Sequence, residues 1–315
     1  MSRRPGAYRR TGADAPFGDP RRAHDVALEG YYWRFADPAT GRVVVALCGV
    51  CRAADGPWAM VTLAAHPGGF VRTVLTRGAW TDPAGLGVIA EPALRATPER
   101  LELDLGADAR LTAALERRVP WPRRGLGGLG PAQVVPGLPQ YWHPHLLGAS
   151  VSGHALLGGE TVDLGGSLAY AEKNWGPAFP GEWWWGQAGG LAGGDAGVAF
   201  AGGRLRGRVA ATALVVHAGG EALRFAAPAA LVSATAGGGA WSVRARSARH
   251  TVALEGEATG PPHRLPVPVP AEHRVVERSR QHLAGRVSVV VRRGRRTLWR
   301  GESALAGLEH GLPAG

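Results

Sequence analysis

The chain has 315 residues, of which 45% are hydrophobic, so it is long and apolar enough for one or two globular domains and too apolar for a disordered protein. All but one of its 36 basic residues are arginine, and its formal net charge is +11. Ala, Gly and Arg are abundant throughout, so coding bias explains much of this charge. No nucleic-acid-binding motif accompanies the charge, and we expect no nucleic-acid partner.

The first 27 residues, 1–27, are basic and contain no apolar stretch, which predicts a mobile tail and not a secretory signal. No segment has the ~18 consecutive apolar residues of a membrane-spanning helix. Two cysteines do not make a disulfide framework, so we expect a reducing, cytoplasmic location. The basic charge also favours peripheral, reversible docking on anionic membranes.

Short strands separated by glycine-rich turns dominate the rest of the chain. Two β runs flank Asp55-Gly56 and two more flank Gly219-Gly220, as in hairpins. Residues 241–247 alternate apolar and polar side chains, which is typical of a strand with one wet face. Residues 98–118 fit a helix and a hairpin about equally well. Because strands and helices do not alternate, the sequence predicts an all-β fold, an antiparallel barrel or sandwich, and not a parallel α/β sheet.

A segment rich in proline and glycine, residues 120–140, interrupts this rhythm of strands. We expect it to link a first β half, residues 28–119, to a second β half, residues 141–315. The run GLGGLG at 125–130 matches the dinucleotide-binding pattern, but that pattern needs a strand before it and a helix after it. Prolines on both sides exclude this context, so we interpret the run as linker glycine.

Two further motifs are too weak to indicate a metal or redox site. Cys48 and Cys51 form a C-x-x-C, but no further zinc ligands stand at suitable spacing and the surrounding run is a strand. Residues three apart on a strand point to opposite faces, so we expect two core cysteines. His143 and His145 share a face if the segment is extended, but no third ligand stands near them, so we favour a polar turn over a metal site.

The stretch YAEKNWGPAFPGEWWWGQ, residues 170–187, closely resembles the signature of the tocopherol cyclase family. It contains Lys173, the single lysine, beside Asn174, the single asparagine. The segment WHPHLLGASVSGHALLGGETVDL before it, LEGYYWRF at 28–35 and VALEGEATGPPHRLPVP near the C-terminus also resemble family elements. The resemblance implies two tandem lipocalin-like β-barrel halves, as in carotenoid 1,2-hydratases.

The resemblance also implies an activity. Named members of the family close the chromanol ring of vitamin E, in an addition of a phenol to the first double bond of an attached prenyl tail. Such a reaction is that of an intramolecular lyase without a metal or redox cofactor, acting on a hydrophobic prenylated hydroquinone. Two alternatives remain open on the same fold: a lipid- or terpenoid-binding protein without turnover, and a hydratase that adds water to an isoprenoid alkene.

The chemistry requires an acid, a base and an apolar cavity. Glu172, a carboxyl beside indoles, is the candidate acid, with a structural ion pair as the equally weighted alternative. His145 is the candidate base for the phenol. Lys173 and Asn174 can donate hydrogen bonds to a quinol oxygen, although strand alternation allows only one of them to face the ligand.

On the strand that begins at Trp183, the same alternation places Trp183, Trp185 and Gln187 on one face. Trp184 points to the other face, where we expect it to pack. Indoles on the cavity face would stabilise a passing carbocation by cation–π attraction, and core filling is the alternative. The complete set of expected substrate-binding residues is Lys173, Asn174, Trp175, Trp183, Trp185, Gln187, Glu29, Tyr31 and Trp33.

Overall fold

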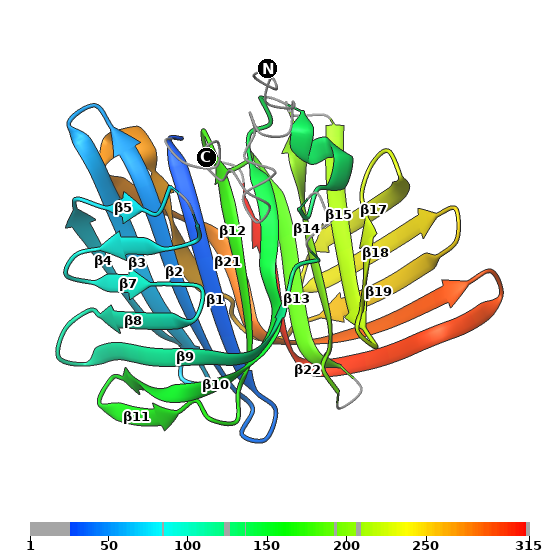
Figure 1. The fold of residues 1–315 in the computed structure, drawn as a ribbon, viewed down its shortest axis with the longest axis horizontal. Helices are drawn as coiled ribbons and strands as arrows, with labels where there is room; N and C mark the ends of the chain where they lie inside the picture. Colours follow the sequence, from blue (N-terminus) through cyan, green and yellow to red (C-terminus); the bar gives the residue numbers. More distant parts are fainter. Residues whose placement is uncertain are drawn as a thin grey trace, which may run out of the picture.

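The computed structural model describes residues 26–83, 85–122, 127–135, 137–191, 194–205 and 209–312. Within those ranges the chain forms two antiparallel sheets of 12 and 10 strands and two short 3-10 helices, η3 (Gly130–Val134) and η4 (Pro270–Glu272). Figure 1 shows the first sheet, blue to green, on one side and the second sheet, green to red, on the other. The prediction of an all-β chain with two lipocalin-like halves is confirmed. The basic segment 1–27 lies almost entirely outside the described residues.

The first sheet has the strand order β4-β3-β2-β1-β12-β10-β9-β8-β7-β6-β5, with β11 beside β10. Its strands are β1 (Leu28–Asp37), β2 (Arg42–Ala53), β3 (Gly56–His66), β4 (Phe70–Arg77), β5 (Trp80–Thr81), β6 (Val88–Ala90), β7 (Leu94–Ala96), β8 (Arg100–Asp104), β9 (Ala109–Pro120), β10 (Tyr141–Leu157), β11 (Glu160–Asp163) and β12 (Leu168–Gly176).

The second sheet has the order β16-β15-β14-β13-β22-β21-β19-β18-β17, with β20 beside β21. Its strands are β13 (Trp183–Leu191), β14 (Ala196–Leu205), β15 (Val209–Ala218), β16 (Glu221–Phe225), β17 (Ala230–Gly237), β18 (Ala240–Ser247), β19 (Thr251–Glu257), β20 (His263–Val269), β21 (Arg274–Arg293) and β22 (Arg296–Gly311).

The local predictions from turns and alternation agree with these elements. β2 and β3 form the hairpin around residues 54–55, and β15 and β16 form the one around 219–220. β18 alternates buried and more exposed residues along its length. Residues 98–118, for which a helix and a hairpin were both open, form the β8–β9 hairpin, where Leu101, Leu103 and Leu111 enter one core.

The two sheets do not divide at the expected linker. β10, β11 and β12, residues 141–176, pair with the first sheet, so the segment 120–140 connects two strands of one sheet. The chain passes to the second sheet between Gly176 and Trp183, inside the signature stretch. Proline and glycine mark a loop in a sequence, but they do not indicate which sheet the next strand joins.

Each sheet has its own core, and a third cluster lies between the two sheets. Tyr31, Trp33 and their neighbours face the first sheet's core, while Trp184 and Phe200 face the second. The cluster between the sheets includes Tyr32, Tyr170, Trp142, Trp185 and Leu283. The central strands therefore bury both faces, and β1 has no wet face at all.

One buried cation joins the sheets. Arg34 is 1% exposed, and its guanidinium donates from Nη2 to the carbonyls of Leu283 (2.9 Å) and Leu305 (2.5 Å) of the second sheet and from Nη1 to Gln187 (3.3 Å). Burial lowers the pKa of Arg34 from its usual value. These hydrogen bonds compensate part of the cost of burying the charge.

The two cysteines of the C-x-x-C motif have the positions expected of core residues. Cys48 lies in the first sheet's core, and Cys51 packs on the opposite face with Trp58 and Met60; both are free thiols. No group of three or more His, Cys, Asp or Glu side chains in the described part of the chain is arranged to hold a metal. Among the same residues, no helix has the length and apolarity needed to cross a bilayer.

Candidate active site

The signature strand β12 sends alternate side chains to two different places. Glu172 and Asn174 point into a cavity between the sheets, while Lys173 and Trp175 point toward the first sheet's own half. β12 lies between β1 and β10, so both of its edges are paired, and its two faces are covered by the first sheet's core and by the cluster between the sheets. The alternation resolves the question that the adjacent lysine and asparagine raised: Asn174 lines the cavity, and Lys173 does not.

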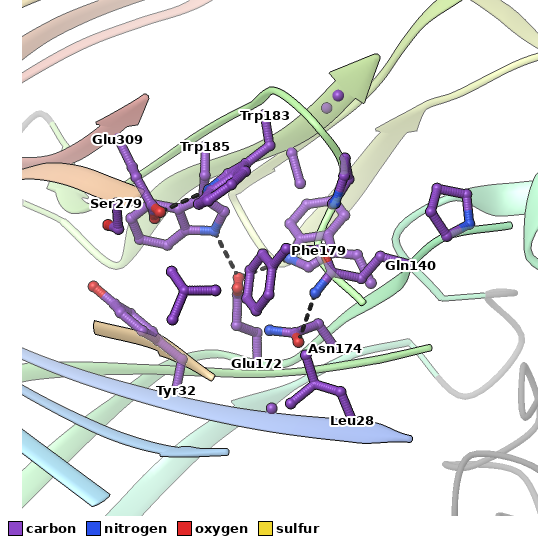
Figure 2. A pocket seen from close by; sticks show the side chains of 18 of the residues that line it. Leu28, Tyr32, Gln140, Glu172, Asn174, Phe179, Trp183, Trp185, Ser279 and Glu309 are labelled. Carbon is purple, nitrogen blue, oxygen red and sulfur yellow. Dashed lines mark hydrogen bonds between the residues drawn. The ribbon is translucent and has the colours of Figure 1, made fainter. Parts of the chain in front are cut away.

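The cavity has a volume of about 210 Å³ and mostly apolar walls. Figure 2 shows Phe179, Trp183 and Trp185 around it, with the two carboxyls Glu172 and Glu309 facing inward from the two sheets. An enclosed apolar space with a few convergent polar groups is the usual form of a small-molecule site. Its lining includes Leu28, Tyr32, Leu47, Met60, Leu138, Gln140, Trp142, Leu265, Pro266, Pro268, Ser279 and Gln281.

Glu172 is held through a single oxygen. Its Oε2 accepts hydrogen bonds from Tyr170 Oη (2.6 Å), Trp142 Nε1 (2.7 Å) and Trp185 Nε1 (2.9 Å). No described residue donates to Oε1. Burial raises the pKa of Glu172, and the three donors oppose this rise because they favour the carboxylate. A protonated Glu172 therefore carries its proton on Oε1, because Oε2 is occupied as an acceptor.

Glu309 is the second carboxyl of the cavity and comes from β22. Its Oε1 accepts a hydrogen bond from Trp183 Nε1 (2.7 Å). Burial raises the pKa of Glu309 to about 7, hydrogen bonds from Trp183 and Ser279 lower it in part, and a charge on Glu172 raises it. The side chain is shielded from bulk solvent but retains some accessible surface, which lies on the cavity wall.

Two indoles of one strand thus hold the two carboxyls. Trp183 and Trp185 are two residues apart on β13, so they share its cavity face, and one donates to Glu309 while the other donates to Glu172. Trp183 lies directly over Gly311 of β22, where a Cβ would overlap the indole ring. Likewise, a Cβ at Gly30 would overlap the side chain of Asn174. Glycines on neighbouring strands therefore make room for the site.

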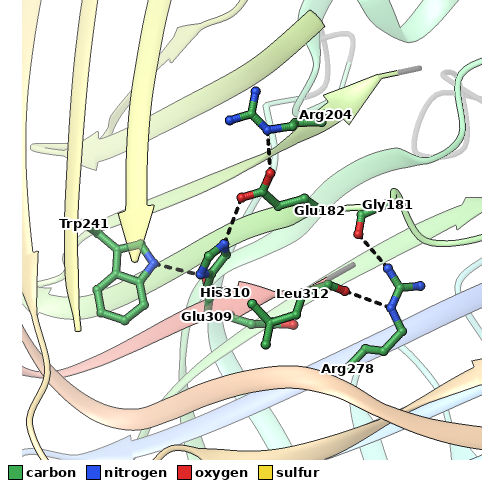
Figure 3. Close-up of polar contacts among 8 residues, drawn as sticks. All are labelled: Gly181, Glu182, Arg204, Trp241, Arg278, Glu309, His310 and Leu312. Atoms are coloured by element: carbon green, nitrogen blue, oxygen red, sulfur yellow. Dashed lines mark hydrogen bonds and ion pairs between the residues drawn. The ribbon is translucent and has the colours of Figure 1, made fainter. Parts of the chain in front are cut away.

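The loop between β12 and β13 forms part of the cavity wall and is fastened to the second sheet. Arg278 donates to the carbonyls of Pro180 (3.1 Å) and Gly181 (2.7 Å), and Glu182 pairs with Arg204 (2.5 Å) and His310 (3.1 Å). Figure 3 shows these contacts around the end of β22. The hydrogen bond from Arg204 lowers the pKa of Glu182. The Phe179 ring packs near Trp183, with ring centroids 5.1 Å apart.

Several residues expected to bind substrate lie on the other face of the first sheet. Lys173 Nζ pairs with Glu29 Oε2 at 3.0 Å, and both side chains are fully buried. Tyr31 borders the cavity, but its hydroxyl donates to Glu29 (3.3 Å) and its ring stacks on Trp33. Trp175 and Tyr31 both receive the Lys173 ammonium over their rings. Glu29, Trp33, Lys173 and Trp175 therefore belong to a packed cluster outside the cavity lining, which Tyr31 joins from the cavity wall, and their contact with a ligand stays a prediction.

His145 and Gln187 are also placed away from the cavity. Burial lowers the pKa of His145 to about 3, and its ring lies beside His143, outside the cavity lining. β10 has register shifts between residues 143 and 149, so simple alternation does not hold there. Gln187 shares a face with Trp183 and Trp185 as expected, but it accepts a hydrogen bond from Arg34 and does not line the cavity.

The residues of the site that were missed at the level of sequence include the two other donors to Glu172, Trp142 and Tyr170, and the polar residues Tyr32, Ser279, Gln281 and Glu309. Tyr32 Oη accepts a hydrogen bond from Gln281 Nε2 (3.0 Å), and its ring meets Trp185 edge to face. A signal for Glu309 exists in the run LAGLEHGLP, where one carboxyl stands in an apolar strand. That signal is ambiguous, because the same pattern describes a strand with one wet face.

Comparison with solved structures shows the fold. The structure resembles CghA with Sch210972 (TM-score 0.58, 11% identity, covering 92% of this chain and 89% of the other), kievitone hydratase from Nectria haematococca (0.54, 10%, 95% and 94%) and a Nitrosomonas europaea protein assigned as AttH (0.54, 15%, 92% and 94%). No protein with a curated description matches the sequence significantly. The tocopherol cyclase-like family model matches residues 140–312, which is more than half of the chain and includes both carboxyls of the cavity. The chain therefore belongs to the tocopherol cyclase-like family.

Proposed function

We propose that the protein is an enzyme that closes a chromanol ring by acid-catalysed addition of a phenol to the prenyl double bond of a prenylated hydroquinone. The observation that carries the proposal is Glu172: a buried carboxyl with three donors on one oxygen and its other oxygen toward an apolar cavity. The family match and the hydratase among the similar folds support an enzyme of this general kind.

The environment of Glu172 suits a strong proton donor. Burial raises the pKa of Glu172 and so favours the protonated form relative to a solvated carboxyl, because the charged form is poorly solvated. The donors Tyr170, Trp142 and Trp185 are already oriented toward Oε2 and stabilise the carboxylate that forms when the proton leaves. The same three bonds therefore stabilise the charge that develops during proton transfer more than they stabilise the resting acid.

The proton from Glu172 Oε1 goes to the less substituted carbon of the alkene, and the positive charge develops on the tertiary carbon. The phenol oxygen attacks that carbon, the C–O bond closes the ring, and the phenol proton leaves. Trp142, Trp183 and Trp185 surround the acid, and their ring faces stabilise a cation by about 1–2 kcal/mol each where water is excluded. Net atoms are unchanged, so the reaction is an isomerisation.

The walls of the cavity support a substrate with an apolar tail. Leu28, Leu47, Met60 and Leu265 are among the apolar residues that line the cavity. A hydrocarbon chain gains about 0.8 kcal/mol for each CH₂ that it buries, so several isoprene carbons supply substantial affinity. The polar groups gather near Glu172 and Glu309, where a hydroxylated ring would lie.

The test is an assay of the purified full chain with a prenylated benzoquinol, followed by chromatography for the chromanol. We expect turnover by the wild type and a loss of at least about 10²-fold in Glu172→Gln, since the amide cannot donate a comparable proton. Glu160→Gln, an exposed carboxyl on β11 that pairs with Arg42, is the matched control and should retain full activity.

Each other result has a defined meaning. A tertiary alcohol as product would replace the cyclase by a hydratase, in which water captures the cation. Tight binding of the quinol without any product would indicate a carrier. Chromanol formation at an unchanged rate by Glu172→Gln would show that the acid is assigned to the wrong residue.

A further inference from the structure

Three polar side chains of the second sheet line the cavity opposite Glu172. Ser279 and Gln281 are alternate residues of β21, and Glu309 of β22 is the register partner of Gln281. All three therefore project from one face of two adjacent strands. In Figure 2 Ser279 and Glu309 lie together on the side of the cavity away from Asn174.

This row includes a polar atom without a partner. Gln281 is 0% exposed, and its Nε2 donates to Tyr32, but its Oε1 has no hydrogen-bond partner among the described residues. The buried hydroxyl of Ser279 interacts with the Glu309 carboxyl, whose pKa it lowers, so the unpartnered atom of the row among the described residues is Gln281 Oε1. Such a group costs free energy when it is left unpaired, so its presence in a cavity wall points to a hydrogen-bonding ligand.

The chemistry of the row selects the ligand group. A carboxylate oxygen, an amide oxygen and a hydroxyl present acceptors side by side, while the donors of the row, the Ser279 hydroxyl and the Gln281 amide NH₂, already face Glu309 and Tyr32. A ligand hydroxyl is a donor and fits this set, whereas an ether or a ketone oxygen would face acceptors. Among the groups of a prenylated hydroquinone, only the ring hydroxyls satisfy this requirement.

Resting on the proposed function, we infer that Ser279, Gln281 and Glu309 form the headgroup subsite, and that Glu309 accepts the proton of the ring hydroxyl that attacks the alkene. The acid then comes from one sheet and the base from the other. Trp183 fixes the carboxylate of Glu309 by donating to its Oε1, which leaves the other oxygen for the ligand.

The step balances. The alkene gains a proton from Glu172, the phenol O–H bond breaks, its electron pair forms the C–O bond, and its proton moves to Glu309. The site then contains an ionised Glu172 and a protonated Glu309. One proton passes back from Glu309 to Glu172 through water that enters when the product leaves, and no oxidant or reductant is needed. The pKa of Glu309, raised by burial to about 7, suits a group that accepts and returns a proton near neutrality.

The subsite is tested by binding alone, with ligands that cannot react. The two probes are a quinol whose prenyl tail is saturated and the dimethyl ether of the same compound, titrated against the full chain by intrinsic tryptophan fluorescence. We expect the wild type to bind the quinol about 10-fold or more tightly than the ether, since a charge-assisted hydrogen bond is available only to the hydroxyl. Glu309→Gln should abolish this preference, because the amide oxygen takes the Trp183 bond and turns its NH₂ toward the ligand hydroxyl.

Two further variants keep the test decisive. Glu302→Gln, an exposed carboxyl on the same strand, is the control and should keep the preference for the quinol. Gln281→Met removes the unpaired acceptor with little change in shape, and it should reduce the preference several-fold. If Glu309→Gln does not fold, as judged by near-ultraviolet circular dichroism, Gln281→Met alone decides: a reduced preference supports the subsite and an unchanged preference overturns it.

Turnover separates this inference from the proposed function. When the wild type forms chromanol, Glu309→Gln should lower kcat by at least about 10²-fold, as expected for loss of a general base. Absence of chromanol with the wild type, together with a quinol preference that depends on Glu309, would refute the cyclase and leave the headgroup subsite standing. Equal binding of quinol and ether by the wild type, or a preference that survives in folded Glu309→Gln, would overturn the subsite.

Discussion

Tyr170→Phe removes one of the three donors of Glu172 and changes little else. The lost bond, from Tyr170 Oη to Glu172 Oε2, is the shortest of the three at 2.6 Å, and the ring remains in place among buried neighbours. The variant therefore tests whether the acid is tuned by its donors, without the loss of shape that a tryptophan substitution would cause. We expect the pKa of Glu172 to rise further, because a bond that favours the carboxylate is lost.

The effect on stability should grow with pH. The folded-state pKa of Glu172 is raised above its unfolded value of 4.5, so the stabilising preference for the proton is complete below 4.5 and is lost as the pH rises through the folded pKa. At low pH the lost bond joins two neutral groups and contributes about 1 kcal/mol, whereas above the folded pKa it acts on a carboxylate and contributes about 1.5–3 kcal/mol. The destabilisation by Tyr170→Phe should therefore increase by about 1 kcal/mol from acid to alkaline pH.

The measurement is urea unfolding at a series of pH values, with Tyr141→Phe as the matched control. Tyr141 Oη donates to the carbonyl of Val135 (2.7 Å), and a backbone carbonyl does not titrate. The destabilisation caused by Tyr141→Phe should therefore be about the same at every pH. Chromanol formation by Tyr170→Phe should slow by about 10-fold, because the forming carboxylate is less stabilised. A destabilisation by Tyr170→Phe that is constant across the series, like that of the control, would refute the account of Glu172 as a buried acid held by its donors.

The remaining predictions concern structure and membranes. Lys173→Met should destabilise the protein by about 3 kcal/mol in urea unfolding, because it removes the ammonium 3.0 Å from the buried Glu29 carboxylate and leaves the Arg52 guanidinium at 3.8 Å. The folded fraction should still bind the saturated quinol, and loss of binding by folded protein would return Lys173 to the site. Gly311→Ala should displace the Trp183 indole and change the near-ultraviolet circular dichroism. Gly181→Ala should leave the spectrum unchanged, because there is open space around Gly181. Identical spectra for the two variants would contradict the packing of Trp183 against Gly311. With a net charge of +11, the chain should float with anionic liposomes at low salt and less at high salt, and no flotation at either salt would exclude peripheral docking.

Local signals in the sequence were sufficient for the strands. Turn glycines located the hairpins. Alternation directed Trp183 and Trp185 toward the two carboxyls and Trp184 toward the second sheet's core, although Trp184 also borders the cavity. The same rule placed Glu172 and Asn174 together on one face and Lys173 on the other. These are consequences of local geometry, so they do not depend on the partner strands.

The faces themselves could not be assigned from the sequence. All ten residues of β1 are buried, so nothing in LEGYYWRFAD distinguishes the cavity face from the core face. The prediction selected Tyr31, and the structure places the neighbouring Tyr32 with its hydroxyl in the site. A shift of one residue exchanges the two faces of a strand, and only the position of the second sheet decides between them.

The other contacts of the site join residues that are far apart in the sequence. Glu309 meets Trp183 across 126 positions of sequence, and Gln281 meets Tyr32 across 249. His145 was a reasonable base by residue type, but its ring lies beside His143, outside the cavity lining, whereas Trp142 of the same strand lines the cavity. Chain topology creates these contacts, and no local pattern in a single sequence contains them.

The most direct measurement is turnover of the prenylated benzoquinol in D₂O, with mass spectrometry and NMR of the product. The exchangeable proton of Glu172 becomes a deuteron, so acid-catalysed closure predicts a chromanol with one carbon-bound deuterium, on the ring carbon next to the new C–O bond. Glu172→Gln should form little of this product. A chromanol without carbon-bound deuterium, or a labelled product formed equally fast by Glu172→Gln, would contradict proton donation by Glu172.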